Sequence, residues 1–126
     1  MAAASPWHEH HDAAFGALAP FRPGIVAHAA VETYSSLTRM PDPNRMHPVE
    51  ALLFLEDWFE DRWIGLTSAA QRLLLGRLSD WGIHGGATYD ALIAGAAAAE
   101  GATLVTLDKR ALATYARVGV DVEFVG

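Results

Sequence analysis

A short apolar strand that ends at an acid is the feature that most constrains the fold of this chain. Residues 104–107 have the sequence Leu-Val-Thr-Leu, and Asp108 follows directly. A run of this length and composition is typical of a strand buried in a parallel sheet. Because ligands of open α/β sheets bind beyond the carboxyl ends of the strands, the position of Asp108 predicts a functional site at that edge.

Two other acids lie in helices that are otherwise small or apolar in their interiors. Asp90 lies near the start of an alanine-rich helix, and Glu32 lies in a helix predicted for residues 29–39. Carboxylates suit hard cations, whereas zinc would need thiolates or several imidazoles. We therefore expect Glu32, Asp90 and Asp108 to form a site for Mg²⁺ or Mn²⁺.

Each acid also has a purely structural explanation. Asp90 lies in a first helical turn, where the helix dipole favours a carboxylate. Asp108 can cap the final helix, and Glu32 can pair with a basic neighbour. His28, one turn before Glu32, can approach the site or serve only as a packing residue. Taken singly, the structural and functional explanations carry about equal weight.

Strands and helices alternate along the chain, which predicts a parallel sheet covered by helices on both faces. The expected strands are residues 24–26, 63–66, 103–106 and 120–125. The expected helices are residues 8–18, 29–39, one opened by Pro48, one capped by Thr67 or Ser68, the Asp90 helix to about residue 100, and 109–117. The side chains expected in the core of the middle region are Leu52, Leu55, Trp58, Phe59, Trp63, Leu73, Leu74, Leu78 and Trp81.

Length and composition indicate a single domain, residues 1–126, without a membrane segment. The absence of cysteine excludes disulfides and thiolate zinc sites, and with no secretion signal we expect a cytoplasmic protein. Nine basic against fifteen acidic residues give a net charge of −6, which disfavours non-specific adhesion to nucleic acid. A local basic rim around the acids remains an option, alongside ordinary solvated helix ends. Its members would be Arg39, Arg45, Lys109 and Arg110.

Three segments together resemble the PIN-domain ribonucleases, specifically the VapC-type toxins of bacterial toxin–antitoxin pairs. The segments are residues 30–41, 85–94 and 104–110, and the resemblance lies in their order and spacing. It implies a three-layer α/β/α domain with a mostly parallel sheet, Mg²⁺- or Mn²⁺-dependent cleavage of RNA, a homodimer and a cognate antitoxin. It also implies that Glu32, Asp90 and Asp108 are metal ligands, and that Thr106 orients a carboxylate or a water beside them.

The resemblance fails at the N-terminus. Members of the family begin with a central apolar strand that ends in an Asp, whereas residues 1–8 already resemble the helix that follows it. We therefore expect the first central strand and its Asp to be missing from this chain, through a late start that omits about five to eight residues.

Two other functions compete with the nuclease. A catalytically silent PIN-like protein would bind its antitoxin or RNA without cleavage, and the missing Asp favours it. A phosphate-accepting receiver domain also uses acids at strand ends, but it needs an acidic pair after its first strand, and the sequence has none. The His-rich segment at residues 8–11 lacks the four-residue spacing of a zinc-binding helix.

Overall fold

Strands and helices alternate through the described part of the chain, as the sequence predicts. The computed structural model describes residues 23–125, and the helix expected at residues 8–18 lies outside them. The elements are β1 (Ile25–Val26), α2 (Ala27–Thr38), α3 (Pro48–Phe59), β2 (Trp63–Ile64), α4 (Ser68–Trp81), α5 (Ala87–Ala99), β3 (Thr103–Thr106), the 3₁₀ turn η3 (Lys109–Ala111), α6 (Leu112–Val118) and β4 (Asp121–Phe124). The α/β class with parallel strands is confirmed. No helix within residues 23–125 has the length and apolar character needed to cross a bilayer.

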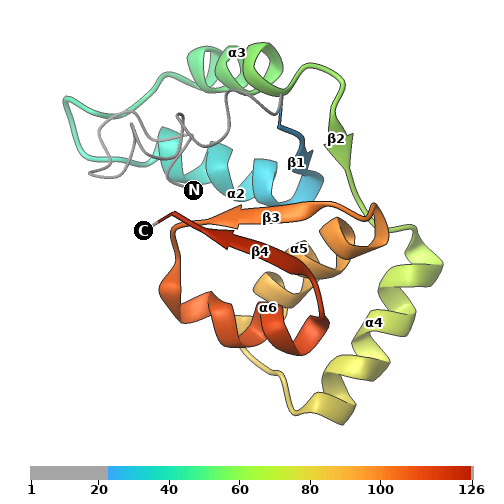
Figure 1. Ribbon diagram of the computed structural model, residues 1–126. Helices are drawn as coiled ribbons and strands as arrows, with labels where there is room; N and C mark the ends of the chain where they lie inside the picture. The colour runs from blue at the N-terminus through green and yellow to red at the C-terminus, as the bar shows by residue number, and fades with distance from the viewer. Residues whose placement is uncertain (1–22, 126) are drawn as a thin grey trace.

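The described strands form two separate parallel pairs rather than one continuous sheet. In one pair Ile25 of β1 lies opposite Trp63 of β2, and in the other Thr103 of β3 lies opposite Asp121 of β4. Within residues 23–125 no strand joins β1 to β3 by hydrogen bonds. Figure 1 shows β3 and β4 between α2 and α3 on one side and α5 and α6 on the other.

Helix α5 is the centre of the packing, because small side chains are buried all around it. Ala91, Ala94, Ala96 and Ala97 are each at most 3% exposed. Successive helical residues are about 100° apart, so these four alanines point in different directions, as expected of a helix enclosed on most sides. Alanine has no bulk beyond Cβ, and neighbouring elements can therefore approach α5 closely.

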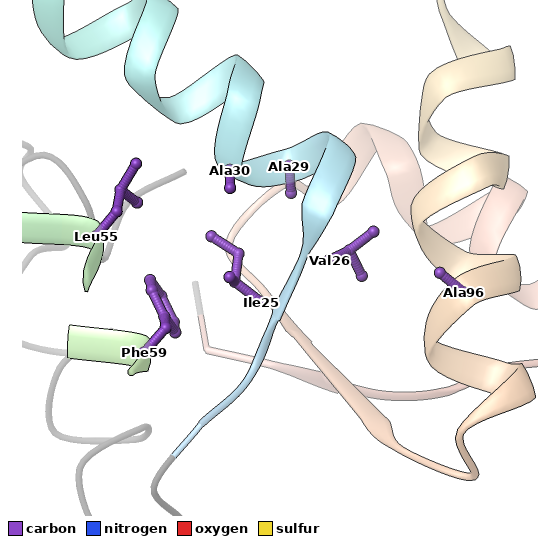
Figure 2. Packing of buried hydrophobic residues seen from close by; sticks show 7 residues of the cluster. All are labelled: Ile25, Val26, Ala29, Ala30, Leu55, Phe59 and Ala96. Carbon is purple, nitrogen blue, oxygen red and sulfur yellow. The ribbon is translucent and has the colours of Figure 1, made fainter. Parts of the chain in front are cut away.

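Three buried clusters meet on α5. Ala96 contributes to a cluster with β1, α2 and α3, in which Ile25 and Val26 lie between the helices (Figure 2). Ala94 and Ala97 pack against α6, and Ala91 packs against α4. The members of the first cluster are Ile25, Val26, Ala29, Ala30, Leu55, Phe59 and Ala96. Elements distant in sequence are thus fixed against one helix, which also carries Asp90.

A close backbone approach holds β1 beside the end of α3. The amide of Ile25 donates to the carbonyl oxygen of Arg62 at 2.9 Å, and Arg62 Nε donates to the carbonyl oxygen of Pro23 at 3.1 Å. A Cβ at Gly24 would lie 2.7 Å from the carbonyl oxygen of Arg62, closer than real Cβ atoms approach. Gly24 is therefore required by the space available at this contact.

Several side chains expected in the core are exposed instead. Leu73 is 71% exposed, because the buried line of α4 runs through Leu74 and Leu78, four residues apart, and Leu73 is rotated away from it. Leu52 is exposed for the same reason, since the buried line of α3 runs through Ala51, Leu55 and Phe59. Trp63 is also exposed.

Trp63 lies in the two-residue strand β2, which within residues 23–125 pairs with β1 alone, and this edge position explains why it is not buried. The remaining two tryptophans expected in the core, Trp58 and Trp81, are half-buried. The core of the middle region is therefore narrower than the sequence pattern predicts.

Candidate active site

Glu32 lies in α2 with its side chain 49% exposed. Its Oε1 is 3.2 Å from Nε2 of His28, one helical turn earlier. Residues four apart share one helix face, which explains the contact. His28 is therefore the neighbour with which Glu32 can pair, as the structural explanation for this acid requires.

Asp90 lies in the first turn of α5 and is half-buried. Burial raises the pKa of its carboxyl group above the usual value, and the negative charges of Asp108 and Glu32 raise it further, while Arg110 lowers it. Glu32, Asp90 and Asp108 come from three different elements, and the charges of Glu32 and Asp108 both act on the carboxyl group of Asp90. The structure therefore places Asp90 within electrostatic reach of the two other acids that the sequence singles out.

Asp108 lies between β3 and η3, in a turn with several local hydrogen bonds. Its amide donates to Oγ1 of Thr106 at 3.0 Å, and its Oδ1 accepts from the amide of Arg110 at 3.0 Å. Asp108 therefore caps η3, which is the structural role considered for it. Thr106 contacts the acidic cluster through the backbone of Asp108.

The donor chemistry of the three acids suits a divalent cation. Their oxygens are the ligands that Mg²⁺ and Mn²⁺ prefer, and a cation would relieve the repulsion that adds to burial in raising the pKa of Asp90. Among residues 23–125, however, no three His, Asp or Glu side chains lie close enough to hold one ion together. The acids share a region without forming a closed cage.

The basic residues expected around the acids differ in position. Arg110 is 94% exposed, with Nε 3.6 Å from Oδ1 of Asp108. Lys109 and Arg39 are exposed, and neither forms an ion pair with another residue in the range 23–125. Arg45 pairs with Asp42 instead, at 3.9 Å. Of the expected rim, Arg110 is the member that acts on the acids.

Two tyrosines near the acids were not singled out from the sequence. Tyr115 of α6 is buried; burial raises the pKa of its hydroxyl, as does the charge of Asp90, while a hydrogen bond with Thr106 lowers it. Tyr89, the residue before Asp90, stacks on His28. Helical spacing alone would place Tyr115 on an apolar face, and no local pattern reveals a stack between residues 61 positions apart.

The acids do not line the hollow between α4 and the start of α5. That hollow has a volume of about 420 Å³ and is lined by Leu75, Leu78, Ser79, Gly82, Ile83, His84 and Thr88. Small ligands favour enclosed pockets, whereas a polymeric substrate reacts at an open surface. The partly exposed acids are suited to a polymeric substrate.

Comparison with known proteins gives consistent similarities over almost the whole chain. Residues 2–118 match the family profile described as PIN domain. Ribonuclease VapC40 of Mycobacterium tuberculosis (strain ATCC 25618 / H37Rv) is 45% identical over 127 aligned residues, which cover 99% of this chain and 92% of the relative. Ribonuclease VapC27 of the same strain is 40% identical over 121 residues, covering 96% and 80%. No solved structure gives a significant match.

Proposed function

The chain belongs to the PIN-domain family, and from this membership we propose that it is a metal-dependent endoribonuclease acting as the toxin of a toxin–antitoxin pair. The observation that carries the proposal is the raised pKa of Asp90, which comes from its burial and from the charges of Asp108 and Glu32 on two other elements. These are the residues that the resemblance assigns to the metal. Relatives named ribonucleases support RNA as the substrate.

Glu32, Asp90 and Asp108 would hold Mg²⁺ or Mn²⁺ through their carboxylate oxygens. When bound, such a cation activates water and offsets the charge that develops on a phosphodiester during in-line attack. The raised pKa of Asp90 means that protons compete for this carboxylate at acid pH. Cleavage should therefore decline as the pH falls toward the pKa of Asp90.

The surrounding residues orient these carboxylates. Thr106 and the amide of Arg110 fix the turn that presents Asp108, and His28 restricts the carboxylate of Glu32. The guanidinium of Arg110 is exposed beside the acids and can attract an RNA phosphate toward them. Lys109 and Arg39 would add positive charge farther along the RNA.

The proposed partners follow from the same family membership. We propose a homodimer, neutralised by a cognate antitoxin, that acts on RNA in the cytoplasm. Positive charge on the antitoxin would complement a cluster in which Glu32 is exposed and Asp90 and Asp108 are partly exposed.

A catalytically silent PIN-like protein is the second candidate. It is favoured by the observation that no three ligands within residues 23–125 lie close enough to hold one metal ion. Such a protein would bind antitoxin or RNA without cleaving it. Metal affinity separates the two candidates, because the nuclease requires a cation and the silent protein does not.

The direct test is calorimetric titration with Mn²⁺ together with RNA cleavage by the same samples. We expect Asp90→Asn and Glu32→Gln to lose both Mn²⁺ binding and cleavage without unfolding. Asp57→Asn, at an exposed acid of α3 outside the cluster, is the matched control and should retain both. Cleavage retained by Asp90→Asn or Glu32→Gln would count against the assignment.

A further inference from the structure

An aromatic stack lies beside the acids, and the function proposed above uses it only through the contact of His28 with Glu32. The rings of His28 in α2 and Tyr89 in α5 have centroids 5.3 Å apart and planes that differ by 5°. Parallel rings at this separation are offset, an arrangement that aromatic pairs favour. The stack links the helix that carries Glu32 to the helix that carries Asp90.

The exposure of Tyr89 distinguishes it from a packing residue. Tyr89 is 53% exposed, whereas Tyr115 on the neighbouring helix is 6% exposed. Burying a large ring is the usual source of its contribution to stability, and Tyr89 leaves much of that surface in water. Its ring is therefore open to a ligand on the part that His28 does not cover.

His28 holds the stack in a defined orientation. Its Nε2 lies 3.2 Å from Oε1 of Glu32, and its ring stacks on the ring of Tyr89. A ring that is already oriented loses less conformational freedom when a ligand binds, so more of the contact energy appears as affinity. The geometry thus gives a preorganised flat surface next to a carboxylate of the proposed site.

The charge of the protein indicates which ligand this surface would take. The chain has a net charge of −6, and the negative charges of Glu32, Asp90 and Asp108 repel a phosphate backbone. Affinity for RNA therefore needs a contribution that does not depend on charge, and stacking of a base on an aromatic ring provides one.

We propose that Tyr89, supported by His28, is a platform on which a nucleobase of single-stranded RNA stacks beside the cleavage site. This inference rests on the proposed ribonuclease function, and it adds the base contact that positions the strand. Because every nucleobase has a flat face, the platform contributes affinity with little preference for sequence.

The test compares two strands of about twelve nucleotides, the site size of typical single-strand binders, by fluorescence anisotropy. One is ordinary single-stranded RNA, and the other has the same ribose-phosphate backbone with every base removed. All proteins carry Asp90→Asn, so that cleavage does not interfere. Tyr89→Ala is compared with Tyr34→Ala, which alters another exposed tyrosine, on α2 outside the stack.

We expect Tyr89→Ala to weaken binding of ordinary RNA about tenfold and to change binding of the base-free strand less than about twofold. Tyr34→Ala should change neither. Equal losses on both strands, or no loss on ordinary RNA, would overturn the platform. A parent protein that binds no RNA would overturn it as well, together with the proposed substrate.

The platform and the nuclease can fail separately. If the protein with its natural Asp90 cleaves RNA in Mn²⁺ while Tyr89→Ala binds RNA as its parent does, the platform is wrong and the nuclease stands. If Tyr89→Ala shows the base-dependent loss while no cleavage occurs, the platform stands and the nuclease assignment is wrong.

Discussion

Oγ1 of Thr106, the last residue of β3, accepts a hydrogen bond from the amide of Asp108 at 3.0 Å. The bond fixes the first turn after the strand, where the carboxylate of Asp108 accepts from the amide of Arg110. The strand ends in Thr and Asp follows two residues later, so that local hydrogen bonds hold the turn that carries the acid.

Thr106→Val should lower RNA cleavage roughly tenfold, because the loss of a residue that orients a metal ligand costs about 10–100-fold. The variant should also lose about 1 kcal/mol of stability through the missing hydrogen bond. Initial cleavage rates and urea unfolding measure the two effects. Thr103→Val, at the exposed start of the same strand, is the control. Cleavage at the natural rate in Thr106→Val would exclude a positioning role for Thr106.

Asp90→Asn should melt a few degrees higher than the natural protein in EDTA, since it removes a charge that is partly buried and that Asp108 and Glu32 repel. Differential scanning calorimetry measures the shift, with Asp57→Asn as the control. The same substitution should abolish any rise in melting temperature on adding Mn²⁺. If Asp90→Asn melts lower than the natural protein in EDTA, burial and repulsion do not destabilise the charged form of this carboxylate.

The stability of the metal-free protein should carry a pH dependence that comes from Asp90. A carboxyl with a raised pKa binds more protons in the folded state, so its contribution to stability falls as the pH rises from about 3.8 through the folded pKa. The difference in melting temperature between the natural protein and Asp90→Asn isolates this contribution. That difference should widen upward from pH 3.8 in EDTA and shrink when Mn²⁺ is present. A difference independent of pH would contradict the raised pKa.

Gly24→Ala should destabilise the protein by about 1–3 kcal/mol, the usual cost of forcing an extra carbon into filled space. The added Cβ would lie 2.7 Å from the carbonyl oxygen of Arg62, which is backbone and cannot swing aside. Gly76→Ala is the matched control, because apart from the nearby backbone of α4 itself no atom of residues 23–125 lies within 4 Å of its Cβ position. It should stabilise the helix by about 0.5–1 kcal/mol. Urea unfolding compares the two, and equal effects would refute the close approach at Gly24.

Local sequence patterns predicted the bounds and caps of elements well where short-range signals determine them. Strand β3 has the expected bounds, because a short apolar run between Gly101 and Asp108 leaves little freedom in where it begins and ends. Thr67 caps α4 through a bond from the amide of Ala70, as one of the two expected caps. The resemblance to the PIN domain, carried by three short motifs, is confirmed over residues 2–118.

Features that depend on tertiary packing were not predictable in the same way. The apolar residues of α3 and α4 fit more than one helical stripe, and neighbouring elements decide that Leu74 is buried while Leu73 is not. The electrostatic effect of Glu32 and Asp108 on Asp90 agrees with the prediction that these acids face one region, whereas a three-ligand metal cluster is not found within residues 23–125. The stack of Tyr89 on His28 depends on how α2 and α5 cross, which no local pattern specifies.

Cleavage of a mixed RNA pool in Mn²⁺, beside an EDTA sample and Asp90→Asn, tests the central claim most directly. The account predicts RNA fragments with the natural protein in Mn²⁺ and none in either control. Fragments that persist in EDTA or with Asp90→Asn, or intact RNA from a folded protein that binds Mn²⁺, would contradict a metal nuclease built on these acids.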